Sequence, residues 1–148
     1  MSPAYRVVAL FDVHLDHELP NHPSYALAKK FVMETKPDIL VIGGDFLDFT
    51  YLGKFNKDKP LLTEGRRYQL DCDMAKRELE CLRTHTKSMH FLVGNHENRV
   101  DRFIERFPIM QDKMSIEADL GLPNLDIEVT QFNKVLKVGK LNFIHGWY

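Results

Sequence analysis

The segment ILVIGGDFLD, residues 39–48, decides the fold that we expect for this chain. Its four apolar residues, Ile39 to Ile42, are typical of a central parallel strand, because such a strand is buried on both faces. Two glycines follow, and Asp45 and Asp48 come next. In open α/β sheets, ligands bind at the carboxyl ends of the strands. The segment therefore predicts a buried strand that leads directly into a binding site.

Strands and helices alternate on both sides of this segment. Before it, we expect a strand at residues 5–11 and a helix from Pro23 to about Thr35. After it, we expect a long helix at about 64–84, a strand at 90–93, a helix that ends at Pro108 and a short helical segment at 115–120. Three closing strands are expected at 127–129, 135–138 and 141–144. This order predicts one α/β domain over residues 1–148, with a parallel sheet that gains antiparallel partners.

The spacing of apolar residues predicts which side of each main helix faces the core. In the first helix, the inward residues are expected to be Leu27, Ala28, Phe31, Val32 and Thr35. In the long helix, they are expected to be Tyr68, Cys72, Ala75, Leu79 and Leu82. Both helices would then pack on the sheet through one apolar stripe.

The composition is that of an ordinary globular protein, with 44% hydrophobic and 28% charged residues. The formal net charge of −1 gives no overall field that attracts nucleic acid or an anionic membrane, so such a partner would need a local patch. No apolar stretch is long enough to span a bilayer, and the N-terminus lacks the pattern of a secretory signal. Cys72 and Cys81 lie on opposite faces of a predicted helix, so no disulfide joins them. We therefore expect a cytoplasmic protein.

Metal-binding residue types follow four of the expected strands. They form the groups Asp12-x-His14, Gly44-Asp45-x-x-Asp48, Gly94-Asn95-His96-Glu97 and His145-Gly146. Each group alone also suits a tight turn or a helix cap. Together, in this order and each after an apolar strand, they predict one site at the carboxyl edge of the sheet. Carboxylate, imidazole and amide ligands suit divalent ions of intermediate hardness.

In this order, the four groups resemble the calcineurin-like metallophosphoesterase superfamily, whose signature is D-x-H, G-D-x-x-D, G-N-H-[DE], H and G-H-x-H. They extend from Asp12 to His145, so the resemblance covers nearly the whole chain. Residues 94–99, GNHENR, and 145–148, HGWY, are similar to bacteriophage or prophage members. The resemblance implies an αββα sandwich with mixed β-sheets, incomplete at the C-terminus. It also implies a hydrolase that acts on phosphomonoesters or phosphodiesters.

The resemblance implies two divalent metal ions, with manganese favoured over iron, zinc, nickel and magnesium. Asp12 and His14 would bind the first ion, Asn95 and His145 would bind the second, and Asp45 would bridge both. Such a pair of ions, about 3.5–4 Å apart, activates a water and neutralises charge on the phosphoryl oxygens.

The same resemblance assigns His96 as the catalytic residue that protonates the leaving oxygen or stabilises the transition state. Asp48 would hydrogen-bond His96, orient it and raise its pKa. Glu97 is expected to orient the turn rather than to join the chemistry. Arg99 is the candidate for a contact with a substrate phosphate, whereas Arg102 is expected to be solvated.

The fifth block of the signature, G-H-x-H, has no counterpart in these 148 residues. Each ion would then keep three protein ligands, so we expect weak metal binding and slow turnover. A shortened sequence, an interrupted gene and a segment supplied by a second chain all explain the difference, and the sequence does not choose among them.

Two further functions stay open. A DNA nuclease of the same superfamily is favoured by a loop with aromatic residues and lysines, although the net charge counts against it and a solvated loop explains it as well. The loop residues are Tyr51, Lys54, Phe55, Lys57 and Lys59. A non-catalytic interaction module with a degenerate metal site is the alternative from another class, and the intact ligand groups argue against it.

Overall fold

The computed structural model describes residues 5–18, 22–56 and 58–146. Lys57 and the last two residues of the HGWY stretch therefore lie outside the described residues. Four parallel strands form the main sheet in the order β1-β2-β3-β4. Their bounds are Val7–Leu10, Ile39–Ile42, Ser88–Leu92 and Ile127–Thr130. The predicted parallel sheet is thus confirmed, and segment 39–42 is one of its two central strands.

The antiparallel strands do not join this sheet, contrary to our expectation. β5 (Leu136–Val138) and β6 (Leu141–Phe143) form a separate two-stranded hairpin. Gly139 lies in the turn between them with a φ of 59°, a backbone conformation that glycine adopts without strain. The first of the three closing strands, β4, instead extends the main sheet in parallel, because helices carry the chain back before it begins.

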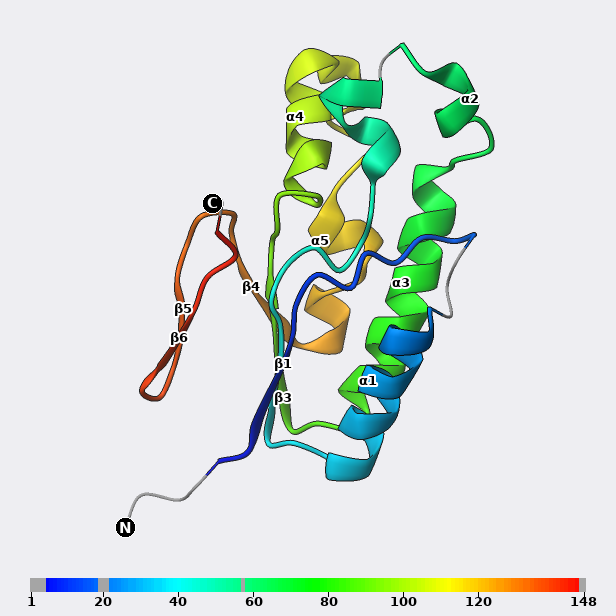
Figure 1. Ribbon diagram of the computed structural model, residues 1–148. Coiled ribbons are helices and arrows are strands. Elements are labelled where there is room, and N and C mark those ends of the chain that lie inside the picture. Colours follow the sequence, from blue (N-terminus) through cyan, green and yellow to red (C-terminus); the bar gives the residue numbers. More distant parts are fainter. Residues whose placement is uncertain (1–4, 19–21, 57, 147–148) are drawn as a thin grey trace.

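Helices cover one face of the parallel sheet and the hairpin lies on the other (Figure 1). The α-helices are α1 (Pro23–Thr35), α2 (Pro60–Thr63), α3 (Tyr68–Arg83), α4 (Asn98–Arg106) and α5 (Ile116–Asp119). The 3₁₀ helices are η1 (Thr50–Leu52), η2 (Lys54–Asn56), η3 (Pro108–Met110) and η4 (Pro123–Leu125). The long helix was predicted to begin near residue 64 but begins at Tyr68, because Gly65 has a φ of 79° and separates it from α2.

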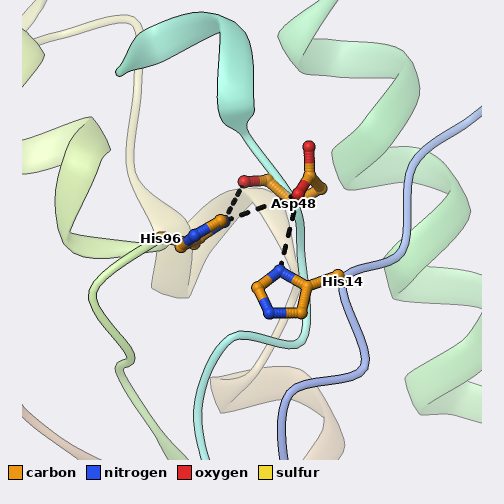
Figure 2. Close-up of side chains that lie close together, drawn as sticks. All are labelled: His14, Asp48 and His96. Carbon is orange, nitrogen blue, oxygen red and sulfur yellow. Dashed lines mark hydrogen bonds and ion pairs between the residues drawn. The ribbon is translucent and has the colours of Figure 1, made fainter. Parts of the chain in front are cut away.

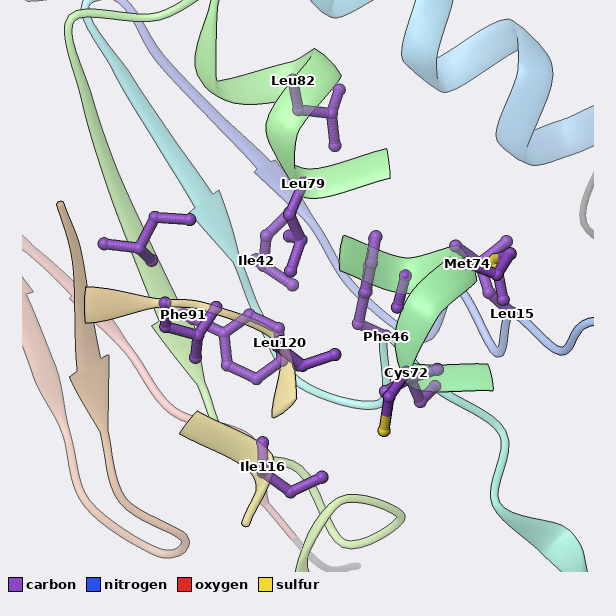
Figure 3. Close-up of a cluster of buried hydrophobic side chains, with 14 of the residues drawn as sticks. Leu15, Ile42, Phe46, Cys72, Met74, Leu79, Leu82, Phe91, Ile116 and Leu120 are labelled. Atoms are coloured by element: carbon purple, nitrogen blue, oxygen red, sulfur yellow. The ribbon is translucent and has the colours of Figure 1, made fainter. Parts of the chain in front are cut away.

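Alternate residues of the strands supply the two cores. Leu40, Ile42 and Phe91 face the helices and pack with Leu79 and other buried residues of α3 (Figure 3). On the opposite face, Val41 and Leu92 pack against Leu136 of the hairpin. Side chains on successive strand residues point to opposite faces, so a strand that is apolar throughout serves both layers. This layering agrees with the expected mixed α/β fold.

The buried residues of α3 agree closely with the prediction, whereas those of α1 agree with it only in part. Four of the five expected residues of α3 are fully buried, and Tyr68 is half-buried. In α1, Val32 is buried as expected, but Leu27 and Phe31 are 71% and 53% exposed, and the helix buries Tyr25 instead. The Tyr25 hydroxyl donates a hydrogen bond to Glu78 of α3 (2.7 Å), and this contact fixes the rotation of α1 about its axis.

Candidate metal centre

The predicted site residues converge at the carboxyl edge of the sheet. They lie in the loops that follow β1, β2 and β3 and in the segment after β6. Asp45 lies at the centre and is only 3% exposed. Its two carboxylate oxygens are directed at different partners. Oδ2 lies 3.8 Å from His14 Nε2, and Oδ1 lies 3.4 Å from His145 Nε2.

Asp12, His14 and Asp45 form the first group. One ligand atom from each lies within 4.8 Å of the other two, a spacing that suits a shared metal ion. His14 Nε2 is 3.9 Å from Asp12 Oδ1. All three residues have left-handed backbone conformations, with φ of 52°, 52° and 51°. Such conformations are costly for residues other than glycine and cluster at functional sites.

Asn95, His145 and Asp45 form the second group. His145 Nδ1 donates a hydrogen bond to the carbonyl oxygen of Gly43 (3.0 Å). A metal ligand atom at His145 would therefore be Nε2, which lies 2.9 Å from Asn95 Oδ1 and 3.4 Å from Asp45 Oδ1. A metal-binding histidine typically holds its second nitrogen to a backbone carbonyl in this way. Three electron-pair donors that face one another fit a divalent cation.

His96 lies beside both groups, and Asp48 lies between His96 and His14 (Figure 2). The backbone N–H of His96 donates to Asp45 Oδ1 (2.9 Å), and its Nδ1 contacts the backbone carbonyl of Asp48. Asp48 Oδ1 lies 3.6 Å from His96 Nδ1 and 3.4 Å from His14 Nδ1. Asp48 thus contacts His96 as expected, mainly through its main chain, and it also contacts a predicted metal ligand.

The net pKa shift of His96 is downward, whereas we expected Asp48 to raise this pKa. Burial lowers the pKa of His96, and the nearby Arg99 charge acts in the same direction, so together they outweigh the carboxylate of Asp45. Asp48 raises the pKa of His96 through its backbone carbonyl, as expected, but the net shift is downward. Burial would raise the pKa of Asp48, but hydrogen bonds from His14 and Thr50 offset it and lower that pKa to about 2. The hydrogen bond that His14 donates to Asp48 is also the main cause that raises the pKa of His14.

Arg99 lies closer to the candidate centre than sequence position alone indicated. Its Nη2 donates to His96 Nε2 (2.8 Å), and its Nη1 donates to the Asp48 carbonyl oxygen (3.1 Å). His96 is therefore held at both ring nitrogens, by a backbone carbonyl on one side and by a guanidinium on the other. The sequence contained a signal for this contact, because Arg99 follows His96 by three residues and lies in the first turn of α4.

Comparison with known families gives the same assignment. The sequence model of the calcineurin-like phosphoesterases matches residues 5–148. The chain belongs to this family. A comparison with curated proteins gave no match. Calcineurin-like phosphoesterases are metal-dependent and act on phosphate esters, and the described residues of this one contain candidate metal-ligand groups. None of its described helices has the length and apolar character needed to cross a membrane.

Glu97 holds together two loops of this calcineurin-like phosphoesterase. Its carboxylate is fully buried and accepts hydrogen bonds from the backbone N–H groups of Asp45 (3.0 Å), Leu47 (2.9 Å) and Gly94 (2.9 Å). Burial raises the pKa of Glu97 to about 7. Glu97 therefore orients the turn, as expected, and also positions the loop that carries Asp45. Gly94 is required there, because a Cβ would collide with Asp45.

Another buried carboxylate of the phosphoesterase, Asp71, was not predicted. It accepts hydrogen bonds from the backbone N–H of His17 (2.8 Å) and from the Tyr51 hydroxyl (2.8 Å), and it also contacts His17 Nδ1 (2.5 Å). These contacts attach the loops after β1 and β2 to α3. The spacing in the sequence could have indicated that Asp71 is buried, because it lies four residues before Ala75 and eight before Leu79, on the inward side of the helix.

Proposed function

We propose that this protein hydrolyses phosphomonoesters or phosphodiesters with two divalent metal ions, manganese being the favoured metal. The observation that carries this proposal is the arrangement around Asp45. One of its carboxylate oxygens lies toward His14, and the other lies toward His145 and Asn95. A carboxylate between two groups of electron-pair donors is suited to bridge two ions.

Each group would hold one ion. Asp12, His14 and Asp45 would bind the first, and Asp45, Asn95 and His145 would bind the second. When bound, the ions would activate a water for attack on phosphorus and neutralise charge on the phosphoryl oxygens. The left-handed backbones of Asp12, His14 and Asp45, and the hydrogen bonds from Glu97, preorganise the loops that carry the ligands.

His96 and Arg99 supply the remaining groups for the reaction. We assign His96 to the leaving oxygen, which its Nε2 would stabilise or protonate once Arg99, which donates to that nitrogen in the free protein, turns to the substrate phosphate. The Asp48 carbonyl holds His96 at Nδ1, so the ring keeps one orientation. Arg99 carries a fixed positive charge against the same ring and would contact a phosphate oxygen of the substrate. Asp48 acts as a positioning residue for both His96 and His14.

A nuclease is the second candidate, and one observation favours it. Lys54 and Phe55 of η2 line the same pocket as Asn95 and Arg99. A positively charged surface with an exposed aromatic ring is typical of proteins that bind single-stranded nucleic acid. The loop that we expected to be solvated thus borders the candidate centre.

The test is hydrolysis of p-nitrophenyl phosphate and bis-p-nitrophenyl phosphate, with manganese and then with excess EDTA. We expect activity that requires the metal and falls by about 10²–10⁴-fold in His96→Ala, the range typical of a lost general acid. His22→Ala, which removes an exposed histidine at the start of α1, is the matched control and should behave as the wild type. A folded, manganese-loaded chain that hydrolyses neither ester would instead indicate a non-catalytic interaction module.

A further inference from the structure

A pocket of about 280 Å³ lies between η2 and α4, beside the proposed metal centre. Its volume is near the lower end of the roughly 300–1,000 Å³ that small-molecule sites occupy. The pocket shares Asn95 with the proposed second metal group. It is also lined by Arg99, which contacts His96. A molecule bound here would therefore lie next to the groups to which we assign the reaction.

The pocket carries more positive charge than one phosphate requires. Its lining residues include Lys54, Arg99, Arg102 and Arg106 and no carboxylate. The three arginines lie three and four positions apart, so they share one side of α4, while Asp101 and Glu105 lie on another. Within the described part of the chain, no ion pair forms at Lys54, Arg102 or Arg106. Clustered cations without partners repel each other, and a bound anion would relieve this repulsion.

Two phenylalanines add an apolar, planar wall. Phe55 is 78% exposed, and Phe103 lines the same pocket. Lys54 Nζ lies 5.0 Å from the centroid of the Phe55 ring. An aromatic ring that is exposed beside a row of cations provides a surface on which a nucleobase can stack while its phosphate is neutralised. Simple sugar or alkyl phosphates would leave the Phe55 ring without such a partner.

We propose that this pocket binds the base and an additional phosphate of a nucleotide substrate and places the scissile phosphate at the metal centre. This inference rests on the proposed function and defines its substrate class. Arg102, Arg106 and Lys54 would neutralise the additional phosphate, and Phe55 would stack on the base. The substrate is either a free nucleotide or a single-stranded nucleic acid, because both offer a base next to a phosphate.

The pocket can be tested without metal or turnover. Thymidine 5′-diphosphate, which carries a second phosphate, and pentathymidylate would be titrated into the chain in EDTA and followed by calorimetry. We expect Phe55→Ala to weaken binding at least about fivefold, the lower limit for loss of one stacked base. Arg102→Gln should weaken it at least about tenfold, the lower limit for loss of one hydrogen bond to a charged group. Both residues are exposed, so these substitutions leave the fold intact. The matched controls are Phe31→Ala on α1 and Arg77→Gln on α3, which replace exposed residues outside the pocket.

The pattern of losses identifies the substrate. Weaker binding of pentathymidylate alone assigns the pocket to nucleic acid, and weaker binding of thymidine 5′-diphosphate alone assigns it to free nucleotides. Binding of neither probe, or binding that all four variants leave unchanged, would overturn the inference. Hydrolysis of bis-p-nitrophenyl phosphate by the wild type, measured in parallel with manganese, tests the proposed function separately. Hydrolysis without pocket-dependent binding refutes only the proposed role of the pocket. Pocket-dependent binding without hydrolysis refutes only the proposed enzymatic activity.

Discussion

Asp45 makes hydrogen bonds that link the loops of the candidate centre. Its backbone N–H donates a hydrogen bond to Glu97, and its carboxylate accepts one from the N–H of His96. Its backbone adopts a left-handed conformation. Its carbonyl also accepts from the N–H of His14 (2.9 Å). Loops after three strands are thus tied to one residue, and the side chains of the site have little freedom to rearrange. This preorganisation depends on the buried carboxylate of Glu97 more than on any other side chain outside the two metal groups.

Replacement of Glu97 should therefore destabilise the fold strongly. Glu97→Ala leaves three buried N–H groups without a partner, and each such loss costs about 1–3 kcal/mol. Urea unfolding in EDTA should show a loss of at least about 3 kcal/mol. Glu97→Gln should lose less, because one amide oxygen still accepts hydrogen bonds. Equal stability of the alanine variant and the wild type would show that Glu97 does not hold the loops.

At this scale the sequence predicts which residues form the site but not how they contact one another. Asp12, His14, Asp45 and Asn95 follow strands of the parallel sheet, so their convergence at one sheet edge was predictable, whereas His145 reaches this edge through the separate hairpin. The hydrogen bond from Leu47 to Glu97 spans fifty residues and depends on how two loops pack, which no local pattern encodes. The same holds for Asp48, which contacts His96 through its carbonyl as well as its carboxylate.

The β5–β6 hairpin is the element that completes the second metal group. It packs on the sheet through Leu136, which contacts Val41 and Leu92, and it leads directly to His145. The apolar strands were predictable because their residues are buried on both faces. The placement of the hairpin was not predictable, since its three-residue strands fit either the edge or the face of the sheet. The rotation of α1 was likewise decided by the distant pair Tyr25 and Glu78.

Weakening the attachment of the hairpin should therefore disturb His145. Leu136→Ala removes the largest buried contact of β5, and we expect a loss of about 2–4 kcal/mol in the free energy of unfolding. Hydrogen exchange of the β5 and β6 amides should become faster, while that of β2 and β3 changes less. Val135→Ala, at a neighbouring exposed position, serves as the control. Unchanged exchange in the Leu136→Ala hairpin would contradict the packing described here.

Acidic and basic side chains gather on different parts of the molecule, although its formal net charge is only −1. Carboxylates gather at the sheet edge, where the metal ligands are proposed, and Arg99, Arg102 and Arg106 gather on one side of α4. Composition alone gave no sign of this separation, because the two groups cancel in the sum. The arrangement suits a reaction in which metal ions bind at the acidic end and an anionic substrate binds beside them.

The most direct test of this account is the number of manganese ions that bind per chain, measured by calorimetry on the wild type and on Asp45→Asn. The account predicts two ions for the wild type and loss of both in the variant, because Asp45 belongs to both groups. Asp112→Asn, at an exposed carboxylate outside the site, should bind as the wild type does. A wild type that binds no manganese, or an Asp45→Asn variant that binds two ions with unchanged affinity, would contradict the proposed centre.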